Sequence, residues 1–182
     1  MLEVPEHLLQ ERSRLGHDRR DEMWEGVLHM VPQPLSSHQL LGARLLVALT
    51  PAADARGLLA SYETSLFRPG TEQSDYRVPD LFVARPEFVS ERGIEGRDEL
   101  VIEILSPGDE SHEKLPFYAR VGCQEVLLID RDTLALELYV RGEARPAGDA
   151  VTLESLGVRI ERVDGPALVV SWEEASTEIR PR

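Results

Sequence analysis

The stretch that decides the fold is Leu100 to Tyr118, LVIEILSPGDESHEKLPFY. Its first six residues are apolar except for Glu103, and so short an apolar run is typical of a strand covered on both faces. An ionised carboxylate in such a strand is costly unless a cation or hydrogen-bond donors compensate it. We interpret the residue as tolerated because a divalent ion neutralises it. Ser106-Pro107-Gly108 then ends the strand.

A helix is expected to follow this strand, with Asp109 or Ser111 as its cap. It carries Lys114, the one lysine in a chain whose 19 other basic residues are all arginine. A lysine retained against that bias suggests a site that uses a compact, rotatable ammonium, for example to orient or activate a water. The competing interpretation is chance, because one lysine must fall somewhere.

Length and composition bound the class of protein. The chain has 182 residues, of which 42% are hydrophobic, and is expected to form a single domain over residues 1–182. We expect its core in about 20–140 and accessory strands with a tail in 141–182. The lone Cys123 excludes an internal disulfide and favours a reducing cytoplasm. No secretory h-region and no apolar run of about 18 residues is found, so no membrane association is expected.

The net charge of −13 argues against broad electrostatic binding to nucleic acid. Two features leave such binding open. Divalent cations invert the local field at a carboxylate cluster, and net charge does not report how 19 arginines are distributed.

The remaining pattern indicates strands interspersed with helices, which predicts an α/β domain built on a mixed sheet. Glu25-Gly26 is a turn candidate for a hairpin, and Ser36 or Ser37 is expected to cap a long helix that Pro51 kinks or ends. The expected helices span 5–14, 36–55 and the segment after 109; the expected strands span 22–30, 58–67, 76–84, 100–105, 125–130 and 134–140, followed by small antiparallel strands and a frayed tail over 177–182.

Asp80 is the second candidate for chemistry. Pro79 donates no ladder hydrogen bond, so Asp80 should sit at a distortion where a side chain can be aimed at a site. The alternative is an aspartate that bonds the backbone of a turn. If Asp80 and Glu103 lie on neighbouring strands, their oxygens suit Mg²⁺ or Mn²⁺, and Lys114 can hold or deprotonate an attacking water. The set predicts metal-assisted phosphodiester hydrolysis.

These residues also carry a resemblance to a known family. Val78-Pro79-Asp80, the strand from Val101 to Pro107, Glu113-Lys114 with Tyr118 to Gly122, and the early Glu22 to Gly26 resemble the Uma-two (Uma2) family of endonucleases, in the PD-(D/E)xK nuclease superfamily. The resemblance spans roughly residues 22–140. It implies a restriction-endonuclease-like fold, a mixed central β-sheet flanked by helices with extra antiparallel strands at the C-terminus.

The resemblance also implies roles for single residues. Asp80 and Glu103 match the metal ligands, with the backbone carbonyl of Ile104 nearby. The superfamily lysine is expected two residues after Glu103, where this chain has Leu105, and Lys114 matches the place on the following helix that the family uses instead. Glu22 and His38 match recurrent family residues. Glu22 is a further ligand, a partner of the ligands, or a solvated charge, whereas His38 is better read as capping or packing.

Three functions follow. The leading one is a Mg²⁺-dependent endonuclease acting on DNA, assigned largely by resemblance, since fold alone does not fix function. A homodimer is expected because cutting two strands calls for two sites, with Trp24 and Trp172 either at an interface or in the core. The alternatives are a catalytically silent nuclease-like scaffold that acts in protein binding or assembly, and a metal-dependent hydrolase of small phosphate esters.

Overall fold

A six-stranded sheet lies at the centre of the computed structural model, which describes residues 5–71 and 73–180. The strand predicted from the Glu103 stretch is one of its middle strands, and it pairs in parallel with the next strand and antiparallel with an earlier one. Across the sheet the order is β12 (Glu143–Arg145), β11 (Leu136–Val140), β10 (Glu125–Asp130), β9 (Leu100–Leu105), β6 (Leu81–Ala84) and β3 (Leu59–Tyr62).

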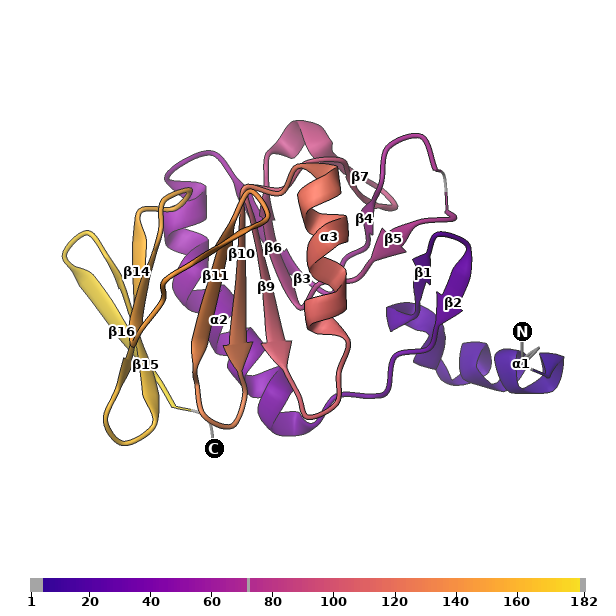
Figure 1. The fold of residues 1–182 in the computed structure, drawn as a ribbon, viewed down its shortest axis with the longest axis horizontal. Coiled ribbons are helices and arrows are strands. Elements are labelled where there is room, and N and C mark those ends of the chain that lie inside the picture. Colours follow the sequence, from indigo (N-terminus) through magenta and orange to yellow (C-terminus); the bar gives the residue numbers. More distant parts are fainter. Residues whose placement is uncertain (1–4, 72, 181–182) are drawn as a thin grey trace.

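Two helices cover opposite faces of this sheet (Figure 1). Side chains of β9 alternate between them: Leu100, Ile102 and Ile104 pack in the same cluster as α2 (Ser36–Asp54), whereas Val101 packs with α3 (Ser111–Val121). Since successive residues of a strand face opposite sides, Glu103 points towards α3. The alternation therefore places the buried carboxylate under the helix that carries Lys114.

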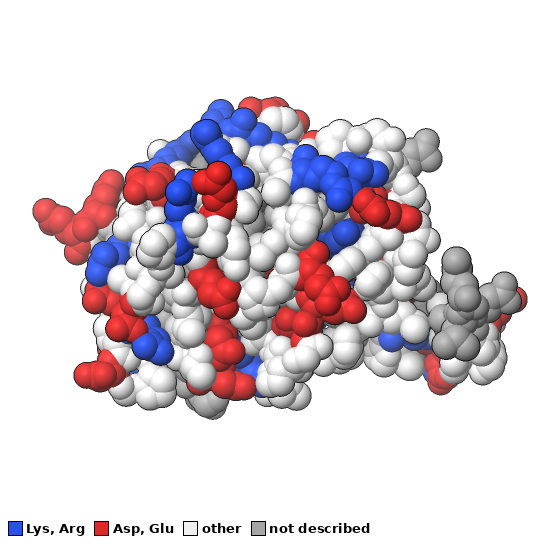
Figure 2. All heavy atoms as spheres, in the orientation of Figure 1, with Lys and Arg blue, Asp and Glu red and all other residues white. Residues whose placement is uncertain are grey.

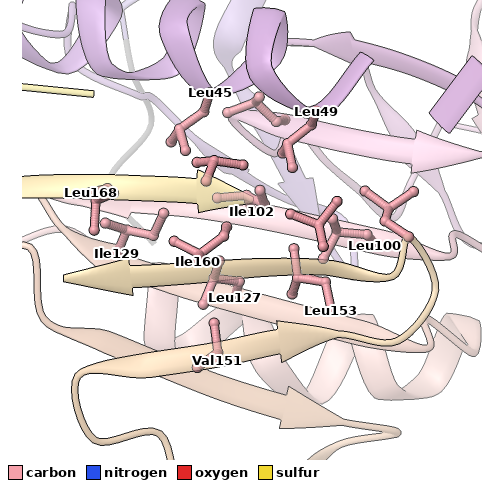
Figure 3. Packing of buried hydrophobic residues seen from close by; sticks show 14 of the residues in the cluster. Leu45, Leu49, Leu100, Ile102, Leu127, Ile129, Val151, Leu153, Ile160 and Leu168 are labelled. Atoms are coloured by element: carbon pink, nitrogen blue, oxygen red, sulfur yellow. The ribbon is translucent and has the colours of Figure 1, made fainter. Parts of the chain in front are cut away.

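A four-stranded antiparallel sheet closes the chain and packs on α2. Its strands are β13 (Ala150–Leu153), β14 (Val158–Val163), β15 (Ala167–Trp172) and β16 (Ala175–Ile179). Figure 3 shows side chains from these strands meeting Leu45 and Leu49 of α2 and the central sheet. The tail expected to fray from Thr177 is instead paired as far as Ile179, which is buried opposite Leu168; residues 181–182 lie outside the described part. Burial of the Ile179 side chain is the physical reason for the difference.

A third sheet of short strands carries the predicted hairpin. Its order is β2 (Val27–His29), β1 (Glu22–Trp24), β5 (Tyr76–Arg77), β4 (Leu66–Phe67), β8 (Gly93–Glu95) and β7 (Val89–Ser90). Gly93 has a φ of +145°, and a Cβ there would lie 2.2 Å from the Ser65 carbonyl oxygen. Only glycine permits this approach of two backbones. The N-terminal α1 (Glu6–Leu15) and the short 3₁₀ helices η1 (His17–Arg20) and η2 (Pro86–Phe88) complete the described chain.

Two strands expected to be continuous are each divided between two sheets. The 58–67 strand breaks after Tyr62, where Glu63 has a φ of +49°, and the 76–84 strand breaks at Val78-Pro79-Asp80. Segment 85–98, which lies between two of the expected strands and where no strand was expected, contributes β7 and β8. Bends at positions without regular pairing account for the divisions, because a strand that turns out of one sheet can pair in another.

The helix starts also differ from expectation. The N-cap of α2 is Leu35 rather than Ser36 or Ser37, and that of α3 is Glu110; neither side chain makes a capping hydrogen bond. The expected Asp109 nevertheless accepts from the N–H of Ser111, the first residue of α3, at 3.1 Å. Pro51 lies inside α2 without ending it. Among the described residues, no helix is long and apolar enough to cross a membrane.

Candidate active site

The predicted site residues line one cavity of about 840 Å³ at the end of β9. Its walls come from η1, β1, β2, the segment before α2, the first turn of α2, the residues that precede β6, β9 and the loop after it, α3 and the residue after β10. The candidate residues that line it are Glu22, His38, Asp80, Glu103, Ile104 and Lys114. The structure thus brings together residues that are up to 92 positions apart in the sequence, from Glu22 to Lys114.

Glu103 is buried, with 2% of its surface exposed, and its charge is compensated by α3. Lys114 Nζ donates to Glu103 Oε1 at 3.1 Å, and the Tyr118 hydroxyl donates to the same oxygen. Burial raises the pKa of Glu103 to about 7, against the opposing effect of the Lys114 ammonium. The hydrogen-bond donors that a buried carboxylate requires are therefore supplied by one helix face.

Lys114 is also buried and lies between two carboxylates. Its Nζ is 2.9 Å from Glu22 Oε1 and 3.1 Å from Glu103 Oε1. Burial lowers the pKa of Lys114, but the nearby charges of Glu103 and Glu22 outweigh it and leave this pKa raised. The side chain is therefore an ammonium that compensates two buried carboxylates, which would otherwise repel each other.

Glu22 is 1% exposed, so it is not the solvated strand-end charge that the sequence left open. Its Oε1 accepts from the Val78 backbone N–H at 2.9 Å, and its Oε2 accepts from the Trp24 indole at 2.7 Å. With Lys114 these bonds occupy both carboxylate oxygens. Glu22 thus connects the hairpin to α3 and to the segment between β5 and β6.

Asp80 lies next to β9 at the bend that Pro79 predicts. The antiparallel register pairs Leu81 with Ile102, which brings Asp80 to the end of β9, and the Ile104 N–H donates to Asp80 Oδ2 at 2.7 Å. Its other oxygen, Oδ1, is 3.7 Å from Arg20 Nη2. Asp80 therefore bonds a backbone N–H of β9 rather than that of a turn, which was the alternative, and it lines the cavity together with Glu103.

His38 reaches this point from the first turn of α2. Its Nε2 lies 3.1 Å from the Ile104 carbonyl oxygen and 3.3 Å from Asp80 Oδ2. Burial lowers the pKa of His38, but its hydrogen bond with Asp80 and the charge of that residue leave the pKa raised. The imidazole thus braces two of the predicted ligands.

Several residues at the site were missed by sequence reasoning. Tyr118 carried a signal, since it follows Lys114 by four positions and must share its helix face. Arg20 and Arg131 carried none, because they reach the cavity from η1 and from the end of β10, far apart in the sequence. Glu63 was also missed; its Oε1 accepts from Arg20 and from Gln39 Nε2.

The oxygens at the site fit a hard divalent cation. Two carboxylates and a backbone carbonyl are the donors that Mg²⁺ and Mn²⁺ prefer. Within residues 5–71 and 73–180, no three His, Cys, Asp or Glu side chains are grouped so as to hold a metal by themselves. Proteins commonly bind Mg²⁺ with one or two carboxylates, and waters fill the other positions.

Comparisons with known proteins point to nucleases. Residues 5–168 match the Uma2 family, described as "Putative restriction endonuclease". No curated protein matches the chain. A crystal structure described as "a putative nuclease belonging to DUF820", from Anabaena variabilis ATCC 29413, is similar with a TM-score of 0.62 and 22% identity, over 75% of this chain and 83% of that chain. The predicted fold class is thereby confirmed, and with more than half of its length matched, the chain belongs to the Uma2 family.

Proposed function

We propose that the protein is a divalent-metal-dependent endonuclease that hydrolyses DNA phosphodiester bonds. The observation that carries the proposal is the convergence of Asp80, Glu103 and Lys114 on one cavity at the end of β9. Membership of the Uma2 family supports the reaction class. The cytoplasm remains the expected location, on the argument of the lone cysteine.

In this proposal Asp80, Glu103 and the Ile104 carbonyl would hold Mg²⁺ or Mn²⁺. Such a cation would supply polarisation of a phosphodiester and stabilisation of the leaving oxygen. Lys114 orients the attacking water: an ammonium has three hydrogens, and Glu22 and Glu103 account for two of them. His38 keeps Asp80 and the Ile104 carbonyl in place.

Incubation of supercoiled plasmid DNA with Mg²⁺ or Mn²⁺ tests the proposal. We expect the wild type to nick the plasmid and Asp80→Asn and Glu103→Gln to lose at least about 100-fold in rate, the scale expected for removing a group that acts in the transition state. Glu161→Gln, on β14 outside the cavity, is the matched control and should cut like wild type. Equal nicking by all four proteins would contradict the site.

Lys114→Arg tests whether the site needs a lysine. A guanidinium is planar and larger than the ammonium that fits between Glu22 and Glu103, so we expect activity to be lost with the fold retained. Arg120→Lys, an exposed exchange on the same helix, is the control. Full activity of Lys114→Arg would mean that any cation serves there.

One observation favours the alternative of a catalytically silent scaffold. The Glu22–Lys114–Glu103 network is satisfied internally, and the net charge of −13 opposes contact with nucleic acid. Calorimetric titration with Mn²⁺ separates the two functions. Binding that Asp80→Asn abolishes, accompanied by turnover, supports the nuclease; no binding, or binding without turnover on any substrate, supports the scaffold.

A homodimer belongs to the proposal for a duplex substrate, because one site cuts one strand. Sedimentation analysis of the protein with and without DNA measures it. A protein that cuts both strands of a duplex while remaining monomeric would contradict this part alone.

A further inference from the structure

Part of the lining of the cavity that holds the carboxylates is apolar. It is formed by β2 and the segment that leads into α2, where several apolar side chains are exposed. We call this wall the apolar strip; it consists of Leu28, Met30, Val31, Pro32, Pro34 and Leu35. An exposed apolar surface inside a concave site is the usual signature of a ligand-binding wall.

The strip is held in position by specific bonds. The Val31 N–H donates to Asp21 Oδ1 at 3.0 Å, and Arg12 of α1 pairs with the same buried carboxylate. At its other end, His29 stacks on Trp24 with ring centroids 4.0 Å apart and lies 2.9 Å from Glu110. The wall therefore keeps its place beside the site before any ligand arrives, as a preorganised subsite requires.

Leu35, a residue of the apolar strip, occupies a position where it makes the start of α2 less stable. It occupies the N-cap of α2, where serine, threonine, aspartate or asparagine would bond a free backbone N–H. Its side chain makes no such bond and is 61% exposed. An apolar side chain that lines a cavity from a capping position departs from the usual N-cap preference, and such departures are expected at functional positions.

Arg131 also lines the cavity and is a cation suited to a phosphate. It follows β10, and its Nη1 donates to Ser106 Oγ at 3.2 Å. Among the residues that the structure describes, its ion pair is with the exposed Asp132, at 3.0 and 3.1 Å. Asp132 is largely exposed, so a phosphate could take its place with the same two-pronged geometry.

The cavity has the size of a nucleotide site rather than of a duplex channel. Its volume of about 840 Å³ lies within the range of small-molecule pockets, roughly 300–1,000 Å³. Glu103 and Lys114 lie buried at its end. On the face drawn in Figure 2, acidic and basic side chains are interspersed, with the basic ones gathered mainly towards the upper edge. This face offers no continuous basic surface of the kind that holds the phosphates of a long duplex.

We infer that the site takes an unpaired nucleotide of DNA, whose base lies against the apolar strip while a flanking phosphate meets Arg131. A base paired and stacked in a duplex does not expose its faces to such a wall, whereas a single-stranded or locally melted one does. The inference rests on the proposed function for its chemistry. A single strand also needs only one catalytic site.

Binding without hydrolysis tests the inference directly. Fluorescence anisotropy is measured in Ca²⁺ with a labelled 30-nucleotide single strand, the blunt duplex of the same sequence, and that duplex with a central bubble. We expect the wild type to bind the single strand and the bubble at least about ten-fold more tightly than the duplex, since unstacked bases are accessible only there. Equal or tighter duplex binding, or no binding of any of the three, would overturn the inference.

Leu35→Ser removes the apolar side chain and supplies a good N-cap residue, so the fold is not at risk. It should weaken single-strand binding about five- to ten-fold, the scale of partly burying one leucine, and leave duplex binding unchanged. Leu40→Ser is the matched control, because Leu40 is 41% exposed on α2 but does not line the cavity. If the Leu35→Ser protein binds the single strand as tightly as the Leu40→Ser protein, the apolar strip takes no part in recognition.

Two further readouts separate this inference from the proposed function. Arg131→Gln should lower the salt dependence of single-strand binding by about one counterion, as loss of one phosphate contact requires. Cleavage in Mg²⁺ or Mn²⁺ should rank the three DNAs as binding does. Preferential single-strand binding without any cleavage would contradict the proposed nuclease function and support the nucleotide subsite. Efficient metal-dependent cutting of the duplex alone would support the nuclease function and contradict the subsite.

Discussion

Glu103 and Lys114 show that a buried charged residue requires compensating groups around it. The carboxylate lies in an apolar strand, and the ammonium that compensates it is itself buried and held by a second carboxylate, Glu22. Tyr118 donates to the same oxygen of Glu103. Removing one charge from such a group leaves the others unpaired in a low-dielectric interior, which costs more than the intact pair contributes.

This predicts a large and non-additive effect of Lys114→Met on stability. The substitution leaves Glu22 and Glu103 uncompensated, so we expect the free energy of unfolding at pH 7 to fall by about 3–5 kcal/mol. Adding Glu103→Gln removes one of the stranded charges and should restore part of the loss. Urea denaturation of both single variants and the double variant measures the coupling; strict additivity would contradict the network.

Asp98 predicts a pH dependence away from the site. It is fully buried, and neither of its carboxyl oxygens has a hydrogen-bond partner among the described residues. Burial, with a smaller effect of the Glu99 charge, raises the pKa of Asp98 well above its usual range. The folded state therefore holds this proton at pH values where the unfolded chain, with an Asp pKa of about 3.9, has lost it.

Because this folded-state pKa is raised, the contribution of Asp98 is fully present below about pH 4 and is lost as pH rises through the raised value. Within that window, stability should fall by up to about 1.4 kcal/mol per pH unit. Asp98→Asn should flatten this part of the profile, whereas Asp164→Asn, in an exposed turn, should not. Chemical denaturation from pH 4 to pH 8 measures it, and parallel profiles for wild type and Asp98→Asn would contradict the prediction.

At the scale of elements, the start of α2 combines a missing cap with an exposed leucine. Leu35→Ser should raise the free energy of unfolding by about 0.5–1 kcal/mol, because a serine at the N-cap accepts from a backbone N–H that now lacks a side-chain partner. The same change at Leu40, inside the helix, should bring no gain. Thermal or urea denaturation measures both. A Leu35→Ser protein that is less stable than wild type would show that Leu35 serves packing instead.

Elements with a strong local signal could be predicted from the sequence. The buried strand Leu100–Leu105 and the hairpin at Glu25-Gly26 follow from apolar runs and turn residues, and both are present. The division of 58–67 and 76–84 between two sheets could not be predicted, because periodicity indicates a strand but not the sheet in which it pairs. The gathering of Asp80 and Glu103 was predicted only on the condition that their strands are neighbours, and the place of Lys114 came from the family resemblance. Arg20 and Arg131 reach the site through tertiary packing, which produces no local pattern in the sequence.

For the molecule as a whole, the closing sheet belongs to the same core as the proposed catalytic strand. Val151, Ile160 and Leu168 lie in one cluster with Leu45 of α2 and Ile102 of β9 (Figure 3). Residues 141–182 are therefore not peripheral to the packing. The expected limit of the family resemblance near residue 140 was wrong, because the family match extends to residue 168. Whether residues 1–182 form a single domain remains a prediction, and this shared core supports it.

The two tryptophans make that prediction measurable. Trp24 lies in β1 near the site, and Trp172 lies in β15 against the shared core. In urea, Trp24→Phe reports on the closing sheet through Trp172, and Trp172→Phe reports on the site region through Trp24. One cooperative unit requires that Ile160→Ala, which empties a fully buried position in β14, lower the free energy of unfolding by about 2–5 kcal/mol in both backgrounds. If only the Trp172 transition moved, the closing sheet would unfold on its own, and the chain would contain two units rather than one.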